Sequence, residues 1–180
     1  MSKKKNEKEK KTKIVSGVSE NIGKYSQDTT ENHPFSLTGE TPLKIRDVIK
    51  KECGSGEKFR EQTCFQLDDF DKKRCAERSR SGVDIVFSLT TNKVLLVEAK
   101  FRVVSEQKVN SVFKQSLNKK LEDSIDILGE PPMVLRSPFI ILANDKMASK
   151  MRAQLYRLGN GSPKGLTVMS EDDFFTRFFE

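Results

Sequence analysis

The residues that decide the fold are SGVDIVF at positions 81–87 and VLLVEAK at positions 94–100. Both segments are rich in Val, Ile, Leu and Phe, which is typical of buried β-strands. A three-residue linker, residues 90–92, separates the predicted strands Val83–Leu89 and Lys93–Phe101. The asparagine in this linker tolerates the left-handed conformation that such a loop needs. The sequence therefore predicts an antiparallel hairpin.

Three charged side chains, Asp84, Glu98 and Lys100, interrupt these apolar strands. Burying a charge costs free energy unless the charge is paired or bound to a metal. Because side chains alternate between the faces of a strand, Glu98 and Lys100 should point the same way. If Leu89 faces Lys93, Asp84 lies opposite Glu98 with the Cβ atoms about 5 Å apart. Both carboxylates can then hold one ion.

This arrangement suits metal-dependent hydrolysis. Two carboxylates are typical ligands of Mg²⁺, which keeps several waters and also binds phosphate oxygens. A bound metal polarises the scissile phosphate and helps to generate hydroxide. Lys100 can orient or deprotonate the attacking water, or neutralise developing negative charge. The alternative interpretation is a structural salt bridge between Lys100 and one of the carboxylates.

The segments around the hairpin alternate between helical and strand patterns. The predicted elements are a helix beginning at Thr41, a strand at Thr63–Leu67, a helix over Ser105–Leu128 with Gly129 as its cap, a strand at Pro138–Ala143, a helix from Asn144 to Gly159, a strand at Leu166–Met169, and a helix that opens at Ser170 and bears four phenylalanines. This order predicts an α/β fold with a central mixed β-sheet flanked by helices.

Residues 1–40 contain few large apolar side chains and are predicted to form a disordered lysine-rich tail and linker, leaving one domain over residues 41–180. The net charge is +7, and residues 1–13 contribute +5 of it through seven lysines and two glutamates. Such a tail can raise nonspecific affinity for nucleic acid by neutralising phosphates. A solvated tail without a partner is the simpler interpretation.

Other features exclude several classes of site. Cys53, Cys64 and Cys75 lack the short paired spacing of a zinc site and are predicted to be reduced thiols. The glycine-rich segments 54–58 and 159–165 lack phosphate-loop spacing, so no nucleotide cofactor is expected. No run approaches the roughly 18 apolar residues of a membrane span, and no apolar segment follows the basic N-terminus. We expect no membrane association and a cytoplasmic location.

The run of Asp84, thirteen residues, then Glu98-Ala99-Lys100 resembles the PD-(D/E)XK signature of restriction-endonuclease-like nucleases. The predicted α-β-β-β-α-β order over residues 41–169 is also that of this superfamily. Val83 stands where the signature has proline, a departure that many members share. The resemblance implies that Asp84, Glu98 and the Ala99 carbonyl bind Mg²⁺, with Mn²⁺ as a substitute, and that Lys100 takes the role of the catalytic lysine.

Some members of this superfamily use further acidic or amide side chains. A glutamate from the first helix or the following segment would be Glu52, Glu57 or Glu61 here, and a glutamine from the helix after the lysine strand would be Gln107 or Gln115. The sequence leaves the choice open.

A basic segment precedes the first carboxylate of the motif. It is a candidate DNA-backbone contact, although a solvated loop is an equal alternative, and its basic residues are Lys72, Lys73, Arg74, Arg78 and Arg80.

The resemblance implies a Mg²⁺-dependent endonuclease that hydrolyses DNA phosphodiester bonds in restriction, phage defence or DNA repair. The alternative is a catalytically silent member of the same fold that binds nucleic acid or a partner protein, and a toxin-like nuclease is a third hypothesis. RNA stays open as a substrate. A homodimer stays open as well, because a duplex cutter needs one site for each strand.

Overall fold

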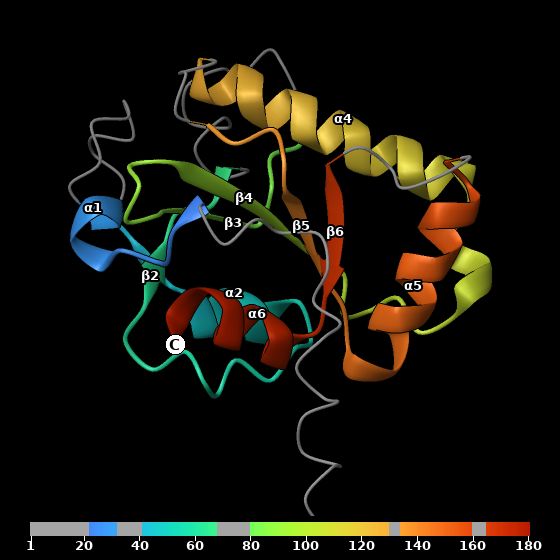
Figure 1. Cartoon of the computed structure of the whole chain (residues 1–180), viewed down its shortest axis with the longest axis horizontal. Helices are drawn as coiled ribbons and strands as arrows, with labels where there is room; N and C mark the ends of the chain where they lie inside the picture. The colour runs from blue at the N-terminus through green and yellow to red at the C-terminus, as the bar shows by residue number, and fades with distance from the viewer. Residues whose placement is uncertain (1–21, 32–40, 68–79, 130–133, 160–164) are drawn as a thin grey trace, which may run out of the picture.

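The computed structural model describes residues 22–31, 41–67, 80–129, 134–159 and 165–180 (Figure 1). Helices and strands alternate along these ranges. In chain order they are α1 (Gln27–Glu31), β1 (Leu43–Lys44), α2 (Ile45–Lys51), β2 (Thr63–Cys64), β3 (Ile85–Ser88), β4 (Val94–Ala99), the 3₁₀ helix η2 (Glu106–Lys108), α4 (Ser111–Leu128), β5 (Phe139–Leu142), α5 (Asp145–Arg157), β6 (Leu166–Met169) and α6 (Glu171–Phe179).

The main sheet contains four strands in the order β3-β4-β5-β6. β3 runs antiparallel to β4, whereas β4, β5 and β6 are parallel to one another. The short antiparallel pair β1–β2 connects to this sheet through a bridge between Phe65 and Val86. The predicted mixed α/β sheet flanked by helices is confirmed.

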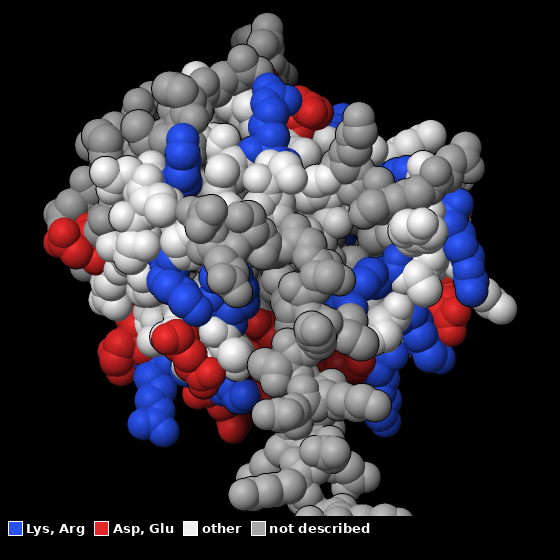
Figure 2. All heavy atoms as spheres, in the orientation of Figure 1, with Lys and Arg blue, Asp and Glu red and all other residues white. Residues whose placement is uncertain are grey.

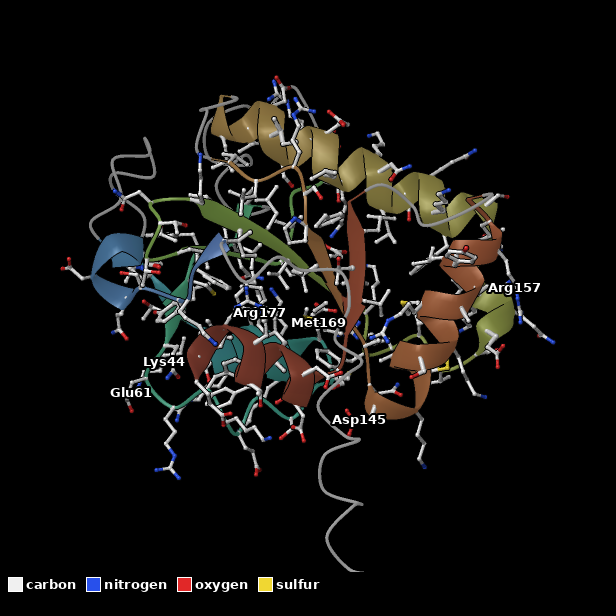
Figure 3. All side chains as sticks on the ribbon, in the orientation of Figure 1. Lys44, Glu61, Asp145, Arg157, Met169 and Arg177 are labelled. Carbon is white, nitrogen blue, oxygen red and sulfur yellow. The ribbon has the colours of Figure 1, made fainter. Side chains whose placement is uncertain are left out.

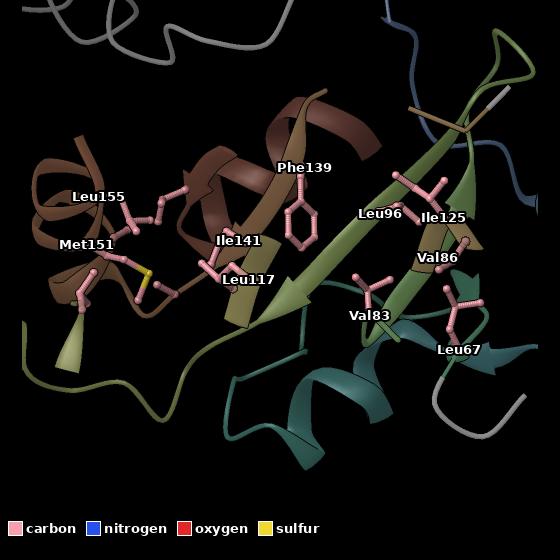
Figure 4. Packing of buried hydrophobic residues seen from close by; sticks show 14 of the residues in the cluster. Leu67, Val83, Val86, Leu96, Leu117, Ile125, Phe139, Ile141, Met151 and Leu155 are labelled. Carbon is pink, nitrogen blue, oxygen red and sulfur yellow. The ribbon is translucent and has the colours of Figure 1, made fainter. Parts of the chain in front are cut away.

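Helices cover both faces of the sheet (Figure 1). α4 and α5 pack on one face in a cluster that includes Leu117 and Met151, part of which Figure 4 shows. α2 and α6 pack on the other face. Along β4, Leu96 belongs to the first cluster and Val97 to the second. Because strand side chains alternate, the side chain at position 98 points toward α4.

The predicted hairpin is confirmed, including its three-residue loop. The backbone N–H of Leu89 donates to the carbonyl of Lys93 at 2.7 Å, and Asn92 has a left-handed φ of 56°. Two predicted helix caps are also present: the side chains of Asn144 and Ser170 accept hydrogen bonds from backbone N–H groups at the starts of α5 and α6.

Residues 22–31 differ from the predicted disordered tail. Tyr25 forms a β-bridge with Leu89. Thr30 is buried, and its hydroxyl accepts a hydrogen bond from the backbone N–H of Ser88 at 3.0 Å. The stretch is too polar to show an apolar period, but its hydrogen bonds dock it against the edge strand β3. The folded domain therefore includes residues before Thr41, and the rest of residues 1–40 lies outside the described ranges.

Two predicted helix boundaries were wrong. The first helix begins at Ile45 instead of Thr41, because Leu43 and Lys44 pair with β2. The predicted helix Ser105–Leu128 is interrupted, since Asn110 caps a separate helix α4 that begins at Ser111. Val112, in the first turn of α4, is 69% exposed.

Cys53 and Cys64 are free thiols, and Cys75 lies outside the described residues. Among the helices that the structure describes, none combines the length and the apolar character that crossing a bilayer demands.

Candidate carboxylate–lysine site

The hairpin brings the two predicted carboxylates together. Ile85, the first residue of β3, pairs with Val97, so the preceding residue Asp84 lies opposite Glu98 when this register is extended by one position, as the sequence predicts. Asp84 Oδ2 accepts a hydrogen bond from the backbone N–H of Ala99 at 2.8 Å. This bond holds one oxygen of Asp84 against the end of β4. The ligand role expected for the Ala99 carbonyl stays a prediction.

Glu98 is the most buried member of the site. Its side chain has 0% exposure and forms an ion pair with the ammonium of Lys100, whose side chain is 24% exposed. The two side chains lie on the same face of β4 because they are two residues apart. Lys100 therefore links a buried carboxylate to the molecular surface.

Lys120, which the sequence interpretation missed, completes the site from α4. Its Nζ lies 2.8 Å from Glu98 Oε1, 3.0 Å from Glu98 Oε2 and 3.7 Å from Asp84 Oδ1. One ammonium thus contacts both acids. We call Asp84, Glu98, Lys100 and Lys120 the carboxylate–lysine cluster. The signal for Lys120 was its helical position, three residues after the buried Leu117 and so near the sheet-facing side of the helix.

The second half of α4 also fixes the segment that carries Asp84. The Ser124 hydroxyl accepts a hydrogen bond from the backbone N–H of Val83 at 3.0 Å. Two residues earlier in the segment, the backbone N–H of Ser81 donates to Asp123 Oδ2 at 3.2 Å. These contacts tie the segment that carries Asp84 to the helix that supplies Lys120.

Burial dominates the electrostatics of Glu98. Loss of solvent, and then the nearby charge of Asp84, raise the pKa of Glu98 to about 7, while Lys100 and Lys120 act in the opposite direction. A perturbed carboxyl next to charged partners is typical of a functional site, although structural ion pairs also produce it.

The donor set fits a hard divalent cation. Asp84 and Glu98 already converge on one positive group, the Lys120 ammonium, so their oxygens point toward a common position. Carboxylate oxygens are ligands that Mg²⁺ and Mn²⁺ accept, with water filling the remaining positions. Within the described ranges, no third His, Cys, Asp or Glu side chain joins the two carboxylates. A metal there would have to take the place of the ammonium.

The three candidate glutamates lie elsewhere. Glu52 is 3.8 Å from Arg102, and Glu61 is 3.1 Å from Lys44. Figure 3 shows Lys44 and Glu61 together on the side of the sheet away from α4. Glu57 is exposed and lines a cavity of about 510 Å³ with Lys58 and Phe175. None of these glutamates joins Asp84 and Glu98, because α2 and the loop after it cover the opposite face.

The structure does not bring the glutamines to the cluster either. Gln107 and Gln115 are exposed, on η2 and on the outer side of α4.

Arg80 of the basic segment is 2.7 Å from Asp126, so its charge is paired with α4. The other basic residues of that segment, Lys72, Lys73, Arg74 and Arg78, lie outside the described residues.

Acidic and basic side chains alternate over the face in Figure 2, and the described residues form no broad basic patch there.

No protein-family model, curated protein or solved structure matches the chain. The function is therefore inferred from the cluster itself.

Proposed function

We propose that this protein is a Mg²⁺-dependent endonuclease of the PD-(D/E)XK type, which hydrolyses DNA phosphodiester bonds at the carboxylate–lysine cluster. The observation that carries the proposal is the convergence of Asp84 and Glu98 on one cation position beside Lys100. The order of β2, β3, β4, α4 and β5 agrees with a restriction-endonuclease-like fold.

In this proposal each residue has a separate role. Asp84 and Glu98 hold the metal, which when bound supplies Lewis-acid polarisation of the scissile phosphate. Asp84 keeps its position through the Ala99 N–H. Lys100 is close to Glu98 and partly exposed, so its ammonium can orient the attacking water or neutralise charge that develops on the phosphate. Mn²⁺ is a substitute metal, and RNA stays open as a second substrate.

One observation favours a second candidate function, a catalytically silent domain that binds nucleic acid or a partner protein. Lys100 and Lys120 together already supply two positive charges for the two carboxylates, so the charges of the cluster balance as an ion-pair network without metal. The two candidates differ in whether a divalent cation binds and whether DNA is cut.

The test is incubation of the full chain with plasmid DNA, linear DNA and RNA in Mg²⁺, Mn²⁺ or EDTA. We expect cleavage of DNA with either metal, none in EDTA, and none by Glu98→Gln purified in the same way. DNA binding without cleavage in any metal would instead support the silent domain. Equal cleavage by the wild type and Glu98→Gln would indicate a contaminating nuclease and contradict the assignment.

A further inference from the structure

Lys120 occupies the position that both carboxylates face. Its ammonium lies 2.8 and 3.0 Å from the two carboxylate oxygens of Glu98 and 3.7 Å from Asp84 Oδ1. A metal bound by both acids has to lie between them, with Mg²⁺–oxygen distances of about 2.0–2.1 Å. An ammonium and a divalent ion cannot share that space, and their like charges repel each other.

We propose that Lys120 is the resident counter-ion of the metal-free site and that metal binding displaces its ammonium. This regulation rests on the proposed function, because it assumes that Asp84 and Glu98 bind the metal. Lys120 holds the two acids together in the absence of metal, and it lowers the affinity of the site for metal by direct competition.

The fold permits this exchange without moving α4. The Lys120 side chain is 19% exposed, so it has a route to solvent, and its four-carbon stem carries several rotatable bonds. Leu117 and Ser124, about one turn away on either side, are buried and keep the helix in place. Rotation of a single side chain therefore suffices. The apparent metal affinity equals the intrinsic affinity multiplied by the fraction of molecules in which the ammonium has left the site.

Calorimetric titration of the metal-free full chain with Mn²⁺, in the absence of DNA, tests the competition. We expect Lys120→Met to bind Mn²⁺ about tenfold more tightly than the wild type, which corresponds to an ammonium in place in roughly nine of ten molecules. The melting temperature of Lys120→Met in EDTA should be lower, because the carboxylates then repel each other. The rise in melting temperature on adding Mn²⁺ should correspondingly be larger.

Lys119→Met is the matched control. It removes the same charge from the adjacent position, but Lys119 is 70% exposed and pairs with Asp123 at 3.4 Å. Its Mn²⁺ affinity should stay within about twofold of the wild type, since exposed charges are screened. Lys120→Arg, which keeps the positive charge, should also stay near the wild-type affinity.

The outcomes separate this inference from the proposed function. If the wild type binds Mn²⁺ and Lys120→Met binds it equally tightly or more weakly, the competition is contradicted. The nuclease proposal is then unaffected. Absence of Mn²⁺ binding in both proteins overturns both. If Lys120→Met does not fold, Lys120→Gln supplies the neutral variant, and an affinity equal to the wild type again contradicts the inference.

Discussion

The backbone N–H of Ala99 donates a 2.8 Å hydrogen bond to Oδ2 of Asp84, so the motif's second strand holds the motif's first carboxylate in place. The contact joins two residues fifteen positions apart, where the β3–β4 ladder ends. Asp84 therefore has two separable properties, a charge that faces the cation position and an oxygen that satisfies a buried N–H.

Asp84→Asn and Asp84→Ala should separate these two properties. The asparagine keeps an oxygen that can accept from Ala99, whereas the alanine leaves this N–H unsatisfied at a cost of about 1–3 kcal/mol. We expect both variants to lose cleavage, and only Asp84→Ala to lose that stability in urea denaturation. Equal stability of the two variants would show that the Ala99 bond contributes nothing.

The buried Glu98 should make the metal-free protein less stable as the pH rises. Its pKa of about 7 in the folded state exceeds its ordinary value of 4.5, so the folded protein binds the proton more tightly than the unfolded chain does. The resulting loss of stability starts near pH 4.5 and is complete above pH 7, and it amounts to about 3 kcal/mol.

The measurement is the unfolding free energy of the wild type and of Glu98→Gln in EDTA, between about pH 4 and about pH 8. This range spans roughly the interval over which the Glu98 carboxyl titrates. The difference between the two proteins should change in favour of the glutamine as the pH rises. A constant difference would contradict the raised pKa of Glu98.

Ser124 should matter for both stability and activity. Ser124→Ala leaves the buried N–H of Val83 without its acceptor, which costs about 1–3 kcal/mol and loosens the segment that carries Asp84. Ser116→Ala is the matched control: the hydroxyls of Ser124 and Ser116 each donate to a backbone carbonyl of α4, but Ser116 is exposed. Urea denaturation and cleavage rates should show a loss only for Ser124→Ala; parallel losses in both variants would argue against the positioning role.

Thr30→Val tests whether residues 22–31 belong to the domain. The variant preserves shape but removes the acceptor for the buried N–H of Ser88, so we expect a loss of about 1–3 kcal/mol in urea denaturation. Thr91→Val removes another contact of the same segment, the hydrogen bond from the Thr91 hydroxyl to the Ile22 carbonyl, but this bond is exposed, so we expect a smaller loss. If Thr30→Val is as stable as the wild type, the segment is docked only weakly.

The sequence predicted the hairpin and its charged residues well because local pattern determines both. Alternation places Glu98 and Lys100 on one face, and loop length sets the register that puts Asp84 opposite Glu98. Lys120 could not be assigned in this way. Its contact with Glu98 spans twenty-two positions and depends on how α4 is rotated over the sheet, which packing decides.

The auxiliary residues and the N-terminal segment show the same limit. Glu61 lies beside Lys44 because β1 pairs with β2, and the motif carries no information about that pairing. Tyr25 and Thr30 dock through hydrogen bonds to other segments, and the Tyr25 ring also packs against phenylalanines, so no apolar stripe marks this segment. A polar sequence with such contacts has the composition of a linker.

The most direct test of the nuclease account is the cleavage rate of Lys100→Met under single-turnover conditions in Mg²⁺, together with DNA binding in Ca²⁺. Lys119→Met is the control for loss of one positive charge. If Lys100 serves the chemical step, Lys100→Met should bind DNA like the wild type and cut it roughly a hundredfold more slowly or worse. Cleavage by Lys100→Met at the wild-type rate would contradict the account. So would a variant that loses DNA binding and stability without a separate effect on the cleavage rate.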